Sequence, residues 1–399
     1  MRVAQILLAV LLLAYVGVSV IPAWRGLHGP HNAKDWASYY YGAQVLAEGG
    51  DPYALPLLQQ AAQADGFAQT VYPYLYPPPF LLEVWWMVPL SAPVSRDILF
   101  ALNQAAWLGL GVVLWRWFRP PLLLLGVLAV TLTPVTHAGR LGQVNGIVAL
   151  LVAAALWRRS GGLLSAAAMI KMSPALYLPV WAAQGRWRAV LLSVVGAVGL
   201  SVLALLVVPL EVQVHFYRDL LPGFSSGAYN GLQVPVGLNA NHSIPSALDV
   251  LWPGPDDYTL SAGVRSVSSV LLLVALALAA WLSRRVSGVL SEACLFGALT
   301  VALVVLPVYA YEHHLALLAL PVAALGAALL SGRLPGWSWA LALPGYLAVA
   351  WPLAGFRQAL RAAPELAWLI RECKLLGAIL IGLLCFWAAL RGPSSDRPS

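Results

Sequence analysis

The chain has 399 residues, of which 60% are hydrophobic and 10% are charged, whereas soluble domains carry about 25% charged residues. This composition excludes a soluble globular protein and predicts an all-α, polytopic integral membrane protein. The formal net charge is +7, but the basic residues fall in short clusters between apolar runs. They therefore indicate membrane orientation and no nucleic-acid partner.

The N-terminal segment predicts one membrane span followed by an external loop. Residues 3–22 form an apolar run behind Arg2, which we interpret as an uncleaved span with its N-terminus inside; a cleaved signal peptide is the alternative. Residues 23–73 are then the first external loop, with a short amphipathic helix expected within 54–69. Asp35, the first acidic residue, stands in this loop among Trp and Tyr residues that suit a membrane–water boundary.

The remaining chain predicts a single membrane domain covering residues 1–399, with roughly ten to twelve membrane elements of about 20 residues each. Membrane helices fill 74–209 and 263–391, a second external loop covers 210–262, and a tail covers 392–399. After the first span, helices are expected at 97–115, 121–137, 142–157, 162–183, 187–209, 263–283, 288–309, 313–331, 337–353 and 368–391. The cysteines at 294, 373 and 385 have no spacing typical of a disulfide framework or metal site.

Basic clusters make the orientation prediction sharper. Four arginine pairs separate the apolar runs: Arg116/Arg119, Arg158/Arg159, Arg186/Arg188 and Arg284/Arg285. Such pairs are mostly cytoplasmic, but simple alternation from the N-terminus places the first two outside. We therefore expect broken or re-entrant elements within 74–91 and 162–183, where internal prolines occur, because irregular backbone at membrane depth is tolerated when it lines a cavity.

Polar residues between the apolar runs are the candidate functional residues, because such groups are costly at membrane depth. The stretch 139–146 contains Arg140, Gln143 and Asn145; its amides suit sugar hydroxyls, but a tight turn capping two helices explains them equally well. Lys171 lies in the middle of an apolar run, where a lipid-linked phosphate would satisfy its charge. Snorkelling or an internal carbonyl partner is the alternative for this lysine.

Two further polar groups occur later in the chain. Asn241 and Ser243 lie in the second external loop, where a helix cap explains them at least as well as substrate contact. The stretch 311–314 ends in His313 and His314. Neighbouring residues on a helix point about 100° apart, so this pair is poorly suited to bind one metal ion. A single histidine acting as phosphate ligand or proton carrier is the better interpretation.

The order of these motifs resembles glycosyltransferase family 87. The resemblance covers about residues 5–330 and rests on the following sequences: Asp35 with Tyr39-Tyr40, Gly50-Asp51-Pro52-Tyr53, Tyr76-Pro77-Pro78, Gly142-Gln143-Val144-Asn145, Lys171-x-x-Pro174, Asn241-His242-Ser243 and Glu312-His313-His314. It implies a GT-C fold with the site on external loops, and a donor that is polyprenyl-phosphate mannose. It also implies that Asp35 is the catalytic base and that His313 or His314 lies near the donor. One departure is Met172-Ser173, where a proline next to the lysine is commoner.

The expected reaction follows from donor chemistry. A glycosyl phosphate is already activated, so the protein has to deprotonate an acceptor hydroxyl, neutralise the departing phosphate and align the two. Asp35 is the candidate base, and the candidate donor-phosphate ligands are Lys171, His313, His314 and Arg140. The candidate substrate-binding residues are Tyr39, Tyr40, Gln143, Asn145, Asn241 and Ser243. No metal cofactor is expected.

The sequence therefore predicts inverting transfer of a sugar, mannose by resemblance, on the extracytoplasmic side of the cell membrane. The expected acceptor is a hydroxyl of a glycolipid or glycan, and a protein acceptor also remains open. Two other classes remain as alternatives. A transporter or flippase should show repeated halves with broken helices at matching positions. A lipid-linked glycan ligase would use a diphosphate donor and would not need Asp35.

Overall fold

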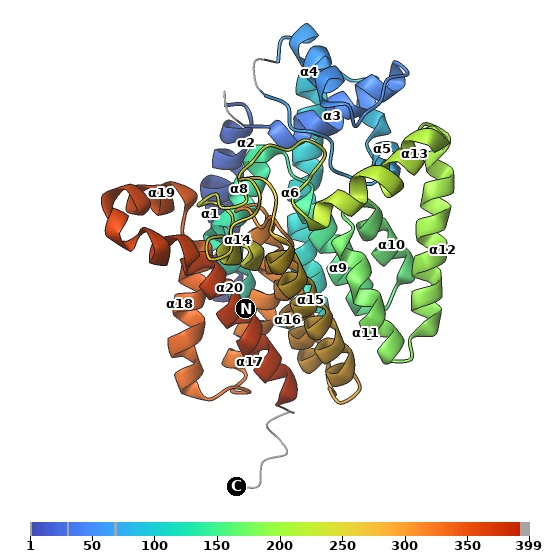
Figure 1. Cartoon of the computed structure of the whole chain (residues 1–399). Helices are drawn as coiled ribbons and strands as arrows, with labels where there is room; N and C mark the ends of the chain where they lie inside the picture. Colours follow the sequence, from blue (N-terminus) through green and yellow to red (C-terminus); the bar gives the residue numbers. More distant parts are fainter. Residues whose placement is uncertain (1, 30–31, 68–69, 392–399) are drawn as a thin grey trace.

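The computed structural model describes residues 2–29, 32–67 and 70–391, so the tail predicted at 392–399 lies outside the described residues. These residues fold into helices joined by turns (Figure 1), and no strand is found among them. One isolated bridge joins Asp256 and Thr259. The prediction of an all-α protein is confirmed.

The N-terminal third contains more helix than the sequence predicts. The first span is α1 (Arg2–Tyr15), a π-helical turn (Val16–Val20) and α2 (Ile21–Leu27), and so it ends at residue 27 rather than 22. The interval 23–73 holds α3 (Lys34–Ala47), which the sequence analysis did not predict, and α4 (Leu55–Ala64), which lies within 54–69 where a short helix was expected. Helix α3 begins after Ala33, which has a φ of 61°, and carries an acidic residue in its first turn, where the helix dipole favours negative charge.

Burial explains why α3 is not apparent in the sequence. The α3 aromatics are almost completely buried, with Trp36 1%, Tyr39 0% and Tyr41 1% exposed. They pack in the protein core and therefore do not expose one ring edge to water, as residues on a membrane–water boundary do. Rings of this size supply the apolar area that stabilises a helix whose sequence looks polar and irregular.

Helices lie close to most of the predicted membrane intervals, and the intervals 121–137 and 162–183 are each divided into shorter helices. The membrane helices are α6 (Ala92–Phe118), α7 (Leu122–Thr131), α8 (Thr133–Leu141), α9 (Asn145–Arg158), α10 (Gly161–Ile170), α11 (Leu178–Ala183), α12 (Trp187–Ala204), α15 (Ala262–Ser283), α16 (Val289–Val305), α17 (Ala319–Leu330), α18 (Trp339–Ala350) and α20 (Ala367–Leu390). Shorter helices complete the chain: α5 (Pro78–Glu83), α13 (Leu210–His215), α14 (Ile244–Asp249) and α19 (Leu353–Ala362).

Within the described residues, five helices are long and apolar enough to cross a membrane, or up to seven elements when two bent pairs are each taken as one span. The bent pairs are α7 with α8, at 52°, and the segment Gly336–Ala350 with α19, at 94°. Four shorter apolar helices add to these. A number near the predicted ten to twelve is reached only by including bent and short elements.

Both intervals expected to be broken are broken. Residues 74–91 contain only α5 and a single 3-10 turn, Trp85–Met87. The interval 162–183 is interrupted where α10 ends, and a 3-10 turn, Ser173–Tyr177, leads into α11. Lys171 at the break has an extended backbone with a φ of −137°, because Pro174 prevents continuation of the helical hydrogen bonds.

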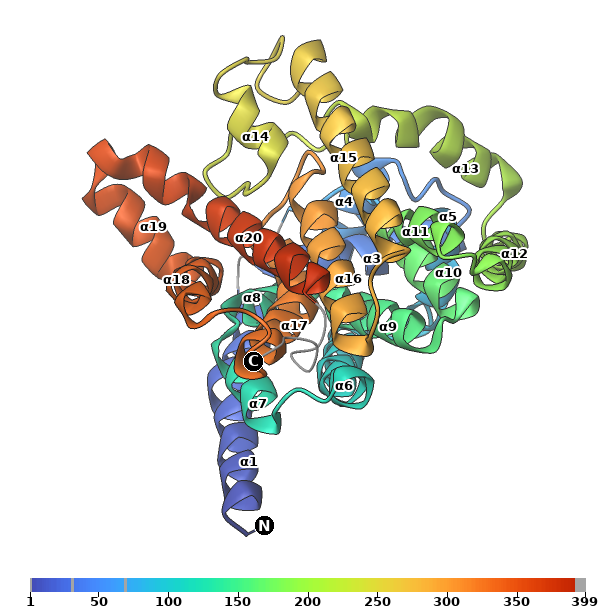
Figure 2. The ribbon, with the colours of Figure 1, turned by 90° about the horizontal axis from the view of Figure 1, so that it is seen from below.

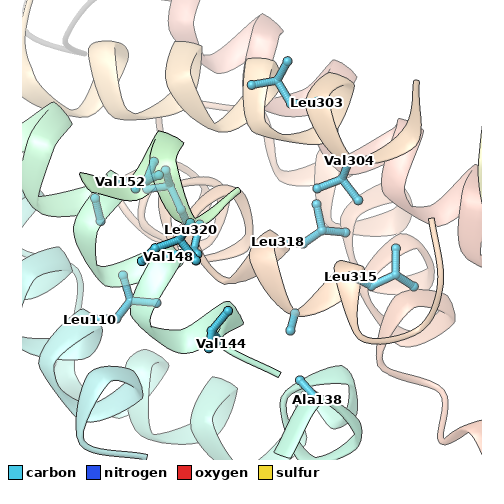
Figure 3. Close-up of a cluster of buried hydrophobic side chains, with 14 of the residues drawn as sticks. Leu110, Ala138, Val144, Val148, Val152, Leu303, Val304, Leu315, Leu318 and Leu320 are labelled. Carbon is cyan, nitrogen blue, oxygen red and sulfur yellow. The ribbon is translucent and has the colours of Figure 1, made fainter. Parts of the chain in front are cut away.

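The apolar core below the break is formed by helices that are distant in sequence. Val148 and Val152 of α9 belong to the same buried cluster as Leu303 of α16, Leu318 of the 3-10 turn before α17, and Leu320 of α17 (Figure 3). Close helix contacts elsewhere depend on small residues, as where Gly345 of α18 meets Gly377 of α20. This packing holds α9, α16 and α17 around the residues described next.

The two ends of the molecule differ in charge. Helices α3 and α4 lie at one end, and the turns joining α11 to α12 and α15 to α16 lie at the other (Figure 1). At this second end, Arg186 forms an ion pair with Glu292, and Arg159 lies 3.7 Å from the same carboxylate. Arg284 donates to the Ala183 carbonyl at 3.0 Å. Viewed from this end, α18 and α19 project from the helical body (Figure 2).

Candidate active site

Asp35 occupies the first turn of α3, and Tyr39 lies one turn later on the same face of the helix. The Tyr39 hydroxyl is 2.7 Å from the hydroxyl of Tyr76 and donates to Gln143 Oε1 at 3.3 Å. Tyr76 also reaches Gln143 Oε1, at 3.4 Å. Gln143 follows Gly142, whose φ of 72° lets the chain turn sharply between α8 and α9. Two segments about 100 residues apart therefore meet beside Asp35.

The surroundings of Asp35 suit a carboxylate that takes up a proton. Burial raises the pKa of Asp35 to about 6, and the charge of Lys171 and a hydrogen bond with Gln143 partly oppose this shift. Its Oδ2 atom is buried and has no hydrogen-bond partner among the described residues. A buried oxygen of this kind is costly unless a partner binds there. Asp35 thus combines a raised pKa with an available acceptor atom.

Lys171 reaches the same place from the break after α10. Its Nζ donates to Gln143 Oε1 at 3.1 Å and to Asn145 Oδ1 at 2.7 Å, and lies 5.9 Å from the centre of the Tyr76 ring. Because these partners are neutral, they hold the ammonium group without cancelling its charge. Lys171 is therefore oriented and still able to bind an anion.

The histidine pair joins this cluster through the backbone. Asn145 Nδ2 donates to the His313 carbonyl at 2.6 Å. The two imidazole rings are 4.1 Å apart, and His314 Nδ1 accepts from the Tyr311 amide at 3.0 Å. His313 Nδ1 is buried without a partner among the described residues, and both rings lie within electrostatic range of Lys171. The fold thus brings together Asp35, Lys171 and the histidine pair.

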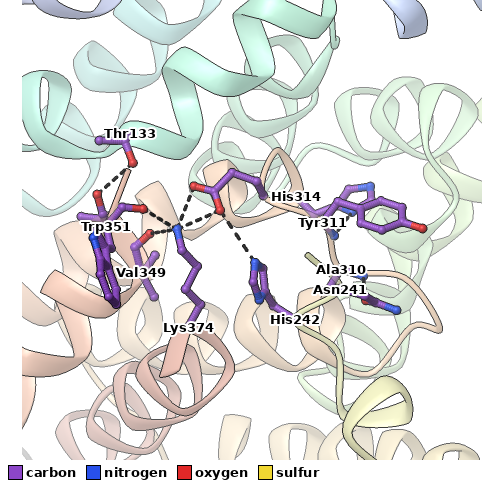
Figure 4. Close-up of polar contacts among 11 residues, drawn as sticks. Thr133, Asn241, His242, Ala310, Tyr311, His314, Val349, Trp351 and Lys374 are labelled. Atoms are coloured by element: carbon purple, nitrogen blue, oxygen red, sulfur yellow. Dashed lines mark hydrogen bonds and ion pairs between the residues drawn. The ribbon is translucent and has the colours of Figure 1, made fainter. Parts of the chain in front are cut away.

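A second polar cluster supports the segment that carries the histidines (Figure 4). Lys374 of α20 contacts both carboxylate oxygens of Glu312, at 2.9 and 2.8 Å, and donates to the carbonyls of Val349 and Trp351. His242 Nε2 lies 3.8 Å from Glu312 Oε2. The side chains of Lys374 and Glu312 are 0% and 2% exposed. Glu312 directly precedes His313, so this ion pair holds the histidine segment against α20.

Lys374 is the main residue of the region that the sequence analysis missed. It lies within the apolar run 368–391, as Lys171 lies within 162–183. The same signal, a lysine surrounded by apolar residues, would have identified it. Its partner could not be identified in this way, because Glu312 is 62 residues away in sequence.

Other predicted residues lie outside the Asp35–Lys171 cluster. The Tyr40 hydroxyl donates to the Leu90 carbonyl at 2.9 Å, and its ring stacks on Trp36. The Arg140 side chain packs against Gly26 of α2, and its Nε atom has no partner among the described residues. Arg140 still acts electrostatically on His137, one turn earlier in α8. Neither side chain contacts Lys171 in the hydrogen bonds described above.

Asn241 and Ser243 have structural partners. Asn241 donates to the carbonyls of Val236 and Val308 and accepts from the Ala310 amide. Ser243 donates to Val308 and caps α14 by accepting from the Ser246 amide at 3.1 Å. Ser243 therefore matches the helix-cap alternative, while Asn241 ties together backbone segments, and neither residue is assigned to substrate. Within the described ranges, no group of three or more His, Cys, Asp or Glu side chains is arranged to hold a metal ion.

Comparison of the sequence with models of protein families gives a match. A family model described as glycosyltransferase family 87 matches residues 74–307, which is more than half of the chain. The matched part contains Gln143, Asn145 and Lys171, whereas Asp35 and the histidine pair lie just outside it. No curated protein matches the chain.

Proposed function

The chain belongs to glycosyltransferase family 87, and from this premise we propose that it transfers mannose from a polyprenyl-phosphate donor to a glycolipid or glycan hydroxyl. The observation that best supports this proposal is that one carboxylate, one lysine and two histidines lie in a single cluster. Gln143 and Asn145 connect the members of this cluster by hydrogen bonds. A hydroxyl nucleophile requires a base such as the carboxylate, and an anionic leaving group requires a cation or hydrogen-bond donor such as the lysine or a histidine.

In the proposed mechanism, Asp35 Oδ2 accepts the proton of the acceptor hydroxyl. The acceptor oxygen then forms a bond to the anomeric carbon from the side opposite the phosphate. The bond between that carbon and the phosphate oxygen breaks, and the electron pair leaves with the polyprenyl phosphate. Lys171 neutralises the charge that develops on this phosphate, and neutral His313 donates a hydrogen bond to it. Displacement from the opposite side inverts the anomeric configuration.

The proposed placement on the extracytoplasmic side has a separate support. Arg159, Arg186 and Arg284 gather around Glu292 and Ala183 at the end opposite α3. Basic residues in short loops are enriched on the cytoplasmic side of membrane proteins. Labelling tests this proposal: in cells expressing a Cys373→Ser background, a membrane-impermeant thiol reagent should label Ser225→Cys and spare Ser287→Cys. The reverse pattern would contradict it.

The test of the reaction uses purified protein with labelled polyprenyl-phosphate mannose and a set of glycolipid and glycan acceptors. Polyprenyl-phosphate glucose supplied in parallel checks the sugar. Wild-type protein should transfer mannose and Asp35→Asn should not. Asp219→Asn on the external segment should behave as wild type, because Asp219 is exposed and, among the described residues, forms ion pairs with Arg218 and His215 alone. Full activity in Asp35→Asn, or no transfer from any lipid-phosphate sugar, would reject the proposal.

A further inference from the structure

A cavity is lined by residues of α3 and α4 and of the turns that follow each helix. The two helices pack against each other (Figure 1). The cavity volume is about 610 Å³. This lies within the range of roughly 300–1,000 Å³ that is usual for small-ligand sites. The cavity is lined by Tyr40, Tyr41, Gln44, Val45, Glu48, Gly50, Leu57, Gln60, Ala61, Ala64 and Asp65.

The cavity and the Asp35 cluster use different faces of one helix. Successive residues of an α-helix rotate by about 100°, so Asp35 and Tyr39 project to one side of α3 while Gln44 and Glu48 project to the other. At about 1.5 Å per residue, Gln44 and Glu48 lie roughly 14 and 20 Å along the axis from Asp35. Helix α3 therefore fixes the distance between the candidate base and this cavity.

The lining has the chemistry of a site for hydroxyl-rich, uncharged molecules. It combines tyrosine rings, carboxamides and carboxylates, and none of the lining residues is basic. Three hydrogen bonds make the walls rigid: Tyr41 to Asp65 at 3.1 Å, Tyr40 to the Leu90 carbonyl, and Gln44 to the Val88 carbonyl at 3.0 Å.

Glu48 and Gln60 make no side-chain hydrogen bond within the part of the chain that the structure describes, so both can bind sugar hydroxyls. Glu48 and Asp65 together disfavour phosphorylated or uronate ligands by charge repulsion.

We propose that the α3–α4 cavity binds an uncharged oligosaccharide portion of the acceptor, several sugar units away from the hydroxyl that reacts at Asp35. This inference rests on the proposed glycosyl transfer and adds the acceptor class to it. It also gives Tyr40 a role in substrate binding, in the acceptor cavity rather than in the Asp35–Lys171 cluster.

Binding is tested directly on the full chain in nanodiscs by ligand-detected NMR titration with two probes, mannohexaose and hexagalacturonate. Ala64→Trp fills the cavity with an indole ring, and Gln63→Trp adds the same ring to α4 outside the lining. We expect mannohexaose to bind wild type and Gln63→Trp alike and to bind Ala64→Trp at least tenfold more weakly. Hexagalacturonate should bind wild type at least tenfold more weakly than mannohexaose.

Three outcomes would overturn the inference: no mannohexaose binding to wild type, equal binding to Ala64→Trp, or equal affinity for the two probes. Glu48→Lys keeps the cavity open and provides a second check, because it should increase affinity for hexagalacturonate at least threefold. This binding measurement needs no donor. Failure of wild-type transfer would therefore contradict the proposed function, whereas failure of the titration would contradict only the acceptor cavity.

Discussion

Replacement of Lys374 by methionine should strongly destabilise the protein. Lys374 and Glu312 form a fully buried pair with two contacts of 2.9 and 2.8 Å. Without the lysine, the Glu312 carboxylate keeps no direct ion-pair partner among the described residues: His242 Nε2 is 3.8 Å away, and Arg357 acts on it only electrostatically. Removing one partner of a buried ion pair costs about 3–5 kcal/mol, because the remaining charge is uncompensated.

The double variant Lys374→Met with Glu312→Gln gives the decisive comparison. Both variants leave the carbonyls of Val349 and Trp351 without their donor, so this cost is common to the two. They differ at residue 312, where an unpaired buried carboxylate costs about 3–5 kcal/mol and an unsatisfied neutral carboxamide roughly 1–3 kcal/mol. The double variant should therefore be about 2 kcal/mol more stable than Lys374→Met alone.

Equilibrium unfolding in mixed micelles measures this difference as a free energy of unfolding. Arg361→Met on α19 is the matched control, because Arg361 is exposed and its loss should change stability by no more than about 0.5 kcal/mol. If the double variant is as unstable as Lys374→Met, the destabilisation comes from lost packing rather than from an unpaired charge. If Lys374→Met is as stable as wild type, the buried pair does not hold the histidine segment.

Three further predictions concern activity. The wild-type transfer rate should rise with pH up to about 6 and then level off, because the ionised form of Asp35 is the base and burial raises its pKa to about 6. Asp35→Asn should lose this dependence and fall by roughly 10²–10⁴-fold, and an unchanged pH profile would exclude Asp35 as the base. Lys171→Met should raise the KM for the lipid-phosphate donor by about 10–100-fold, because it removes a charge-assisted hydrogen bond to the phosphate. An effect on the acceptor KM alone would show that Lys171 does not bind the donor phosphate. Tyr40→Phe should leave the donor KM within twofold of wild type, since its hydroxyl donates to the Leu90 carbonyl. A large rise would instead place Tyr40 in the donor site.

The sequence contained much of the candidate site but little of its geometry. Asp35 and Lys171 each stand out locally, as a carboxylate after a membrane span and as a lysine in an apolar run. Asn241 and Ser243 stand out for the same reason, and the structure gives them backbone partners instead. A polar residue in an apolar stretch indicates that its side chain has a hydrogen-bond or ion-pair partner in the folded protein. The neighbouring sequence does not show whether this partner is a bound ligand or a carbonyl group of the protein.

The sequence by itself determined the membrane class, the positions of most helices and the break at Lys171, because hydropathy and proline act over a few neighbouring residues. Tertiary structure alone decided that the Tyr-rich segment after Asp35 is a buried helix and that Lys374 pairs with Glu312. It also joined Asn145 to His313 across 168 residues. These outcomes depend on contacts between segments that are distant in sequence. Such contacts contribute to stability only after the helices have packed together.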